Sequence, residues 1–185
     1  MGMDYIVKVE ESRSASEGKP SAGPVFRCIY AKDGLMDLPA GLESPWQFLS
    51  DSALKNPNNK MLGRRQVIDS KAGPYVWQTY KEVYDSAIRL GSAMRSRGVN
   101  PGDRCGIYGP NCPEWITAME ACNNQGITYV PLYDTLGANA VEFIINHAEV
   151  SVAFVQENKL PAVSTHFYCN KFYGYGSFIS KAKPG

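Results

Sequence analysis

The sequence has no long apolar run and no excess of charge of either sign. Nowhere in its 185 residues do about 18 consecutive apolar residues occur, which is the length that a membrane-spanning helix requires. Its 19 Lys and Arg residues nearly balance 18 Asp and Glu residues, so the net charge is only +1, and charge gives no reason to expect nucleic acid as a partner. The N-terminus also lacks the basic and apolar regions of a secretory signal. We therefore expect a globular protein that is neither secreted nor membrane-spanning.

The cysteines of the sequence follow no recognisable pattern. An odd number of cysteines argues against a disulfide framework, and the absence of any C-x-x-C pair argues against a zinc site. Thiols of this kind fit a reducing compartment such as the cytosol, and we expect no metal-binding residue. The five cysteines are Cys28, Cys105, Cys112, Cys122 and Cys169.

Residues 1–43 are predicted to form an N-terminal extension with only short elements. Residues 5–9 alternate weakly in the manner of a strand, and residues 26–30 have the composition of a second short strand. Between them, residues 11–23 are rich in Ser, Gly, Pro and charge, which favours a mobile loop.

Two helices and a hairpin are predicted next. Ser44 and Gln47 have the spacing of a capping box and predict a helix over 45–55. A hairpin of residues 61–68 and 75–77 follows, with its turn at residues 70–73.

The second helix is the most strongly marked element of the sequence. Thr79 and Glu82 form another capping box, and Gly98 is expected to end the helix. Apolar or small residues recur at helical spacing and predict one buried face, made of Val83, Ala87, Leu90, Gly91 and Met94.

From residue 100 onward the pattern changes to alternating strands and helices. We expect strands at 105–108, 127–131 and 151–155, with helices at 113–124 and 139–147. A β-α-β-α-β order requires parallel strands joined by right-handed crossovers. The predicted fold class is therefore α/β, with a partial, doubly wound, mostly parallel sheet, and residues 44–160 are its domain.

Four strings in this region resemble eukaryotic long-chain acyl-CoA synthetases, and the plant-type enzymes most of all. The strings are Thr-Tyr-Lys-Glu-Val at 79–83, Arg-Gly-Val-Asn-Pro-Gly-Asp at 97–103, Asn-Cys-Pro-Glu-Trp at 111–115, and Tyr-Val-Pro-Leu-Tyr-Asp-Thr-Leu-Gly at 129–137. The resemblance extends over about residues 5–161. It implies the N-terminal part of the large lobe of an acyl-adenylate-forming, AMP-dependent ligase.

The resemblance implies a two-step reaction for the complete family enzyme. A long-chain fatty acid attacks the α-phosphate of ATP to give an acyl adenylate and pyrophosphate, and coenzyme A then displaces AMP. This chemistry needs backbone N–H groups and a cation around the phosphates, together with Mg²⁺. The family supplies them with a Gly-rich loop ending in Pro-Lys-Gly, a Thr-Glu pair, an Asp for the ribose and a Lys on a mobile C-terminal lobe.

None of those catalytic elements occurs in the 185 residues, which contain no Gly-rich loop ending in Gly-Lys and no Thr-Glu dipeptide. We therefore expect no catalytic, cofactor-binding or metal-binding residue here, and a fragment that is inactive alone, with ATP, Mg²⁺ and coenzyme A implied only for the complete enzyme. An alternative is a non-catalytic binding or regulatory module that pairs with a full-length synthetase. A third reading, an independent nucleotide-binding protein, lacks the glycine fingerprint that it would need after residue 108.

Two loops could contact a ligand, because loops at the carboxyl ends of parallel strands line the crevice of such folds. Asn111 could bind substrate, but it could equally cap the helix that begins at Pro113. Tyr133, Asp134 and Thr135 occupy the corresponding loop after the next strand.

Other prominent side chains have a structural explanation that we favour. Glu114 and His147 suit the electrostatics of a helix N-terminus and a helix C-terminus. Trp115 and Met119, four residues apart, suit core packing. Cys112 lies beside a helix N-terminus, which could lower its thiol pKa.

Residues 161–185 no longer resemble the family and show neither a helical nor a strand period. We expect an aberrant or alternative, disordered tail, which we attribute to a retained intron, an alternative exon or a faulty gene model. Within it, the stretch Gly174-Tyr175-Gly176-Ser177 lacks the third glycine and the following helix pattern of a phosphate-binding loop. For localisation, the resemblance implies the cytosol or the cytosolic face of the endoplasmic reticulum.

Overall fold

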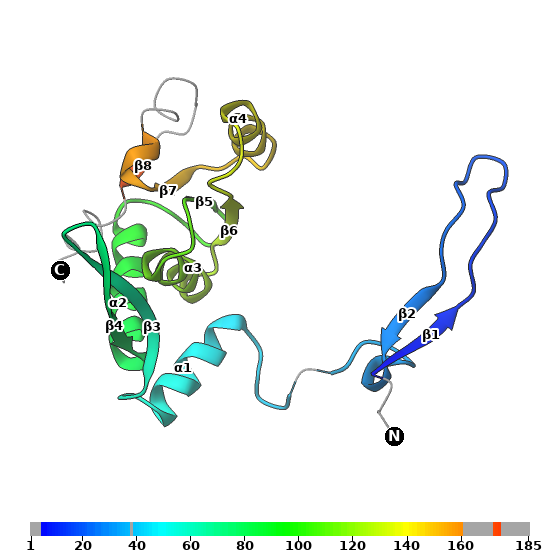
Figure 1. Cartoon of the computed structure of the whole chain (residues 1–185), viewed down its shortest axis with the longest axis horizontal. Coiled ribbons are helices and arrows are strands. Elements are labelled where there is room, and N and C mark those ends of the chain that lie inside the picture. The colour runs from blue at the N-terminus through cyan, green and yellow to red at the C-terminus, as the bar shows by residue number, and fades with distance from the viewer. Residues whose placement is uncertain (1–4, 38, 161–171, 175–185) are drawn as a thin grey trace. The chain divides into compact units, whose positions relative to one another are not determined.

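The computed structural model describes residues 5–37, 39–160 and 172–174 and is shown in Figure 1. The chain divides into two compact units, residues 1–43 and 44–185. This division falls at the first boundary expected above, while the assignment of three domains stays a prediction. No helix among the described residues is long and apolar enough to cross a membrane.

The first unit is a hairpin of two strands. β1 (Ile6–Glu10) pairs antiparallel with β2 (Val25–Cys28), and a short 3-10 helix, η1 (Ile29–Ala31), follows. Backbone pairing extends into residues 11–23, whose mobility stays a prediction. Arg13 and Ala22 exchange two backbone hydrogen bonds of 2.8 and 2.9 Å, and Ser16 and Lys19 exchange two of 3.1 and 2.9 Å. The hairpin therefore continues beyond its strands (Figure 1), because backbone pairing needs no apolar side chains.

The second unit begins with α1 (Pro45–Lys55), which has the predicted bounds. The side-chain oxygen of Gln47 accepts a hydrogen bond of 3.3 Å from the backbone N–H of Ser44, as the capping box requires. Leu49 and Ala53, one helical turn apart, are buried.

A two-stranded hairpin follows, formed by β3 (Lys60–Ile68) and β4 (Lys71–Thr79). Its turn is shorter than predicted, because Ile68 already pairs with Lys71. Asp69 and Ser70 form the whole connection and have φ values of 49° and 61°, the left-handed conformation that two-residue hairpin turns need at both positions. Residues 71–73 therefore belong to a strand and not to the turn.

The long helix α2 (Tyr80–Ser96) confirms the sequence prediction closely. The backbone N–H of Glu82 donates to Thr79 Oγ1 at 3.2 Å, and the backbone N–H of Thr79 donates to Glu82 Oε2 at 2.7 Å. The buried residues of α2 are the five that its spacing predicted.

The remaining elements build a parallel sheet with the predicted β-α-β-α-β order. They are β5 (Arg104–Tyr108), α3 (Pro113–Gln125), β6 (Thr128–Leu132), α4 (Ala138–His147) and β7 (Val152–Val155), followed by the short 3-10 helix η2 (Glu157–Lys159) and the strand β8 (Phe172–Gly174). The strand order is β6-β5-β7-β8, and every pair is parallel.

Helices cover both faces of this sheet. On one face, Ile107 and Phe154 pack with residues of α2 and α3, including Leu90 and Ala118. On the other face, Tyr108, Leu132 and Val155 pack with Val141 and Ile145 of α4. Neighbouring residues of β5 and β7 thus enter different cores, as the pleat of a strand dictates. The unit is a doubly wound α/β fold.

The segment expected to be a disordered tail contains a strand. Residues 172–174 pair with residues 153–155 of β7. The rest of residues 161–185, including Tyr175, Gly176 and Ser177 of the candidate glycine loop, lies outside the described residues.

Candidate functional site

The order of strands creates a switch point between β5 and β7. The chain leaves β5 through α3 to β6 on one side, and then returns through α4 to β7 on the other side of β5. Tyr108 and Val155 are paired at the carboxyl ends of these two strands. Because the loops after such strands diverge, the crevice between them is the usual ligand site of doubly wound folds.

Hydrogen bonds tie the loops at this edge together. The backbone N–H of Gln156 donates to the carbonyl of Tyr108 at 2.9 Å. The ammonium group of Lys159 donates to the carbonyl of Asp134 at 3.0 Å and lies 5.7 Å from the centre of the Tyr108 ring. The loops that follow β5, β6 and β7 are therefore positioned jointly, from residues up to 51 positions apart in the chain (108 to 159).

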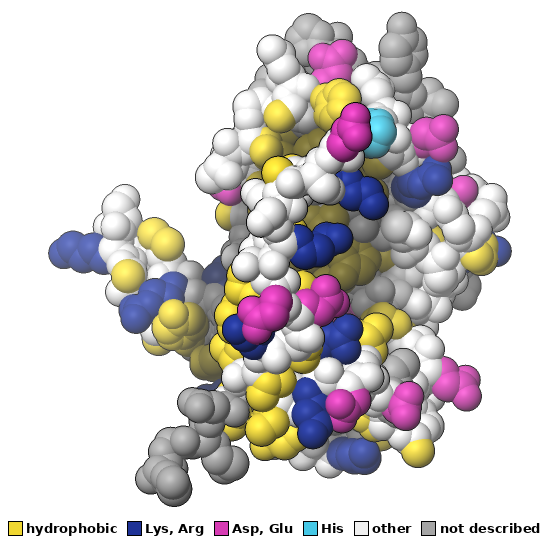
Figure 2. Space-filling view, turned by 90° about the vertical axis from the view of Figure 1, so that its right-hand side faces the viewer, with side chains coloured by type: hydrophobic (Ala, Val, Ile, Leu, Met, Phe, Trp, Pro, Cys, Tyr) yellow, Lys and Arg dark blue, Asp and Glu magenta, His cyan; other side chains and the backbone are white. Residues whose placement is uncertain are grey.

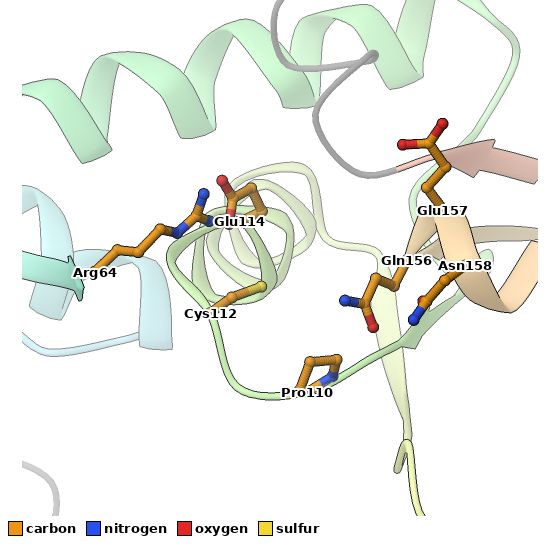
Figure 3. Close-up of a pocket in the computed structure, with 7 residues that line it drawn as sticks. All are labelled: Arg64, Pro110, Cys112, Glu114, Gln156, Glu157 and Asn158. Carbon is orange, nitrogen blue, oxygen red and sulfur yellow. Dashed lines mark hydrogen bonds and ion pairs between the residues drawn. The ribbon is translucent and has the colours of Figure 1, made fainter. Parts of the chain in front are cut away.

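A cavity of about 640 Å³ lies at this switch point. Figure 3 shows Gln156 and Asn158, which follow β7, on one side of the loop that carries Pro110, and Arg64 with Glu114 on the other. The side chain of Glu157 points away from the rest. The residues that line the cavity are Arg64, Pro110, Cys112, Glu114, Gln156, Glu157 and Asn158.

Arg64 stands at the junction of three cavities. It forms an ion pair with Glu114, in which the two side chains are 55% and 24% exposed. Two further cavities, of about 460 and 170 Å³, are also lined by Arg64 and lie between the β3–β4 hairpin and the start of α3. The pair links the hairpin to the helix. Glu114 lies in the first turn of α3, where we expected a carboxylate for electrostatic reasons.

Cys112 precedes α3 as its N-cap residue, and its side chain makes no capping hydrogen bond. Burial raises the pKa of its thiol above the ordinary value, although the N–H of Trp115 acts in the opposite direction. The hypothesis of a lowered pKa is therefore wrong, because the loss of hydration outweighs the favourable helix terminus.

Asn111 does not cap α3, because Cys112 occupies the cap position. Its exposed side chain lines the cavity of about 460 Å³ instead. Tyr133 is 67% exposed in the loop after β6, while Asp134 supplies the carbonyl that Lys159 contacts. Contact of either loop with a ligand stays a prediction.

The predictions of core packing are confirmed. The ring of Trp115 meets that of Tyr129 edge-on at 6.2 Å, and both Trp115 and Met119 pack against the core that α2 and α3 share. His147 is the last residue of α4 and stacks on Phe143 at 5.3 Å, which agrees with a structural role.

The charges of the switch-point cavity do not suit a triphosphate. Its lining has one cation, Arg64, which is already paired, and two carboxylates, Glu114 and Glu157. Within the described ranges, no group of three or more His, Cys, Asp or Glu side chains could hold a metal ion. The cavity offers amide groups and a half-buried thiol, which suit a polar, uncharged part of a ligand.

Sequence reasoning missed Arg64, Gln156 and Asn158. The two amides follow a predicted parallel strand, so the rule that pointed to Asn111 could have found them. No local signal marks Arg64, which lies 50 residues before its partner Glu114.

Comparison with models of known protein families finds a match within the second unit of the chain. The family model described as "AMP-binding enzyme" matches residues 52–171. The match runs ten residues beyond residue 161, where we expected the resemblance to end, so that expectation is wrong.

Curated relatives are much longer than this chain. A Humulus lupulus protein described as "Probable CoA ligase CCL6" is 71% identical over 161 residues, which are 87% of this chain and 24% of that protein. "Long chain acyl-CoA synthetase 2" of Arabidopsis thaliana is 64% identical over 171 residues, 92% of this chain and 25% of that protein. The chain thus spans about a quarter of the length of these relatives.

Among solved structures, the N-terminal domain of FACL13 from Mycobacterium tuberculosis has the same fold. Its TM-score is 0.64 at 19% identity, over 78% of this chain and 38% of that one.

Proposed function

The chain belongs to the AMP-binding enzyme family, and we propose that it is part of a ligase that joins a long-chain fatty acid to coenzyme A at the expense of ATP. The observation that carries this proposal is the 64% identity to a long-chain acyl-CoA synthetase over 92% of the chain. The four strings at 79–83, 97–103, 111–115 and 129–137 support it, since they drew attention to the same family from the sequence alone.

The complete reaction requires stabilisation of charge on the α-phosphate and on departing pyrophosphate. The paired guanidinium of Arg64 and the carboxylates around it do not supply this, and the 185 residues contain no glycine-rich phosphate loop. We propose that this stretch builds one wall of the substrate crevice, and that the 185-residue chain by itself does not form acyl adenylate.

Exchange of labelled pyrophosphate into ATP tests the proposed inactivity of the chain alone. The assay uses the purified 185-residue chain with a long-chain fatty acid, and a full-length synthetase serves as the positive control. We expect no exchange above background from the chain alone. Fatty-acid-dependent exchange would overturn the proposed inactivity and would require an adenylation site within these residues. The identity of the reaction is tested separately, by the acyl-CoA product of a full-length protein that carries these residues.

A second candidate is a non-catalytic module that pairs with a full-length synthetase. The observation that favours it is the position of β6 at one edge of the sheet, where β5 is its partner within the described strands. An edge strand offers backbone groups to an added strand, although Pro131 removes one donor. Co-purification of the chain with a full-length synthetase would support this candidate.

We propose the cytosol, or the cytosolic face of the endoplasmic reticulum, as the location of the protein. The proposal extends what the family resemblance implies, and fractionation of cells that express the tagged chain tests it.

A further inference from the structure

The β3–β4 hairpin has two different faces. Gly63 pairs with Trp77, and Arg65 pairs with Tyr75, so the two aromatic residues share one face. The intervening residue Arg64 points to the other face, where it meets Glu114 of α3. The hairpin therefore contacts α3 through the face that carries Arg64. The face that carries the aromatic rings is partly exposed, and its residues Gly63, Arg65 and Tyr75 also line the cavity of about 460 Å³ beside the start of α3.

The two rings stack on each other and are about half exposed. Tyr75 and Trp77 stack with their centres 5.7 Å apart, and they are 52% and 43% exposed. A Cβ atom at Gly63 would lie 2.8 Å from the ring of Trp77. The indole thus rests directly on the backbone of β3, and glycine is the residue that permits this contact.

A cation accompanies each ring. The ammonium nitrogen of Lys60 is 5.7 Å from the centre of the Trp77 ring, and the guanidinium carbon of Arg65 is 4.8 Å from that of Tyr75, within the range of cation–π attraction. We call Lys60, Gly63, Arg65, Tyr75 and Trp77 the aromatic face.

The tip of the hairpin adds aliphatic surface and charge. Val67 and Ile68, next to the turn, are 75% and 54% exposed. Residues 60–79 contain four cations and one carboxylate, hence a net charge of +3, whereas the whole chain carries +1. Elsewhere acidic and basic side chains are mixed, as Figure 2 shows for the face that it presents. Positive charge is thus concentrated where apolar side chains are exposed.

We propose that the β3–β4 hairpin docks on an anionic lipid surface through its aromatic face and its tip. Tryptophan and tyrosine rings occupy the boundary between headgroups and acyl chains, aliphatic side chains enter it, and Lys and Arg are attracted by anionic headgroups. A polyanion such as single-stranded nucleic acid would use the cations and rings but would leave Val67 and Ile68 in water. The inference does not depend on the proposed ligase activity.

Flotation of the 185-residue chain with vesicles tests this docking. We expect binding to phosphatidylcholine vesicles that contain phosphatidylserine, weaker binding at high salt, and little binding to phosphatidylcholine alone. Each cation removed should weaken binding about fivefold, the equivalent of ~1 kcal/mol. The triple variant K60Q/R65Q/K71Q should therefore lose binding by well over tenfold.

The control variant K55Q/K81Q/R89Q removes the same charge from exposed positions on α1 and α2 and should bind as the wild type does. Equal losses in the two triple variants, or unchanged binding of K60Q/R65Q/K71Q, would overturn the proposal. Equal binding to neutral and anionic vesicles would also overturn it. A competition experiment would overturn it too, if a single-stranded oligonucleotide displaced the chain from vesicles at a lower concentration than free anionic lipid does.

Fluorescence locates the contact independently of charge. Brominated acyl chains should quench part of the tryptophan emission of the vesicle-bound protein. This quenched part should be absent from W77F. The control variant Y133A/F143A, which removes exposed aromatic rings from another region, should retain it. Quenching that persists in W77F would place the contact at another tryptophan and refute the assignment to the hairpin. Circular dichroism of each variant confirms that it is folded.

Discussion

Replacement of Gly91 by alanine sets two opposing effects against each other where α2 meets α3. Gly91 is buried in the middle of α2, where alanine is favoured over glycine by about 0.8–1.0 kcal/mol of helix propensity. The added Cβ, however, would lie 2.8 Å from Cγ of Gln125 and 3.3 Å from the carbonyl oxygen of Ala121.

The magnitudes decide the expected sign. The contact with Gln125 is far inside normal separation, but it involves a half-buried side chain in the last turn of α3 that can rotate, so its cost is at the lower end of overpacking, about 1 kcal/mol. The contact with Ala121 needs a shift of only a few tenths of an ångström. We therefore expect Gly91→Ala to leave the free energy of unfolding nearly unchanged. In a Gln125→Ala background the clash is absent, and the same substitution should stabilise the fold by about 1 kcal/mol.

Urea unfolding of the wild type, both single variants and the double variant, followed by circular dichroism, measures this coupling. A coupling energy near 1 kcal/mol between positions 91 and 125 is the expected result. If Gly91→Ala instead destabilises both backgrounds equally by more than about 1 kcal/mol, the backbone of Ala121 limits the approach of the helices, and the reasoning is refuted.

Two further predictions concern titrating groups. Burial raises the pKa of the Glu120 carboxyl, so its contribution to stability is complete below about pH 4 and is lost as the pH rises through the raised pKa. The variant Glu120→Gln should therefore be more stable than the wild type at about pH 7 and no more stable near pH 4. Urea titrations in which the stabilities of the two proteins change in parallel with pH would contradict this. Burial likewise raises the pKa of the Cys112 thiol, whereas Cys28 is exposed. In a Cys169→Ser background, the reaction of the protein with an aromatic disulfide reagent at about pH 8 should therefore have a fast phase. The Cys28→Ser variant should lack this phase, and the Cys112→Ser variant should retain it. The opposite pattern would show that Cys112 is the reactive thiol.

Features encoded by neighbouring residues could be predicted well from the sequence. The capping boxes at Ser44 and Thr79 and the buried residues of α2 all depend on partners three or four positions apart. The order of strands and helices after residue 100 was also predicted, with bounds that differ by a residue or so. Their parallel pairing then follows from general rules of chain connection.

Predictions made from composition or from local position alone missed or misplaced three features that depend on contacts. Residues 11–23 are rich in Ser, Gly, Pro and charge, so no period reveals that their backbones pair. The turn of the second hairpin was placed on the glycine-containing stretch 70–73, yet Asp69 and Ser70 adopt the left-handed conformation themselves. At Cys112, the direction of the pKa shift depends on burial, which a helix N-terminus alone does not reveal.

The sequence by itself determined the local elements, the α/β class and the family, because caps, periodicity and family strings lie in consecutive or nearly consecutive residues. Only the tertiary structure decided which side chains meet at the switch point. Arg64 reaches Glu114 across 50 positions, and Gln156 comes beside Tyr108 because β7 lies next to β5 and not next to β6. The aromatic face has the same origin, since its rings lie over Gly63 through the register of two strands. Such meetings depend on the path of the whole chain, and no local pattern specifies that path.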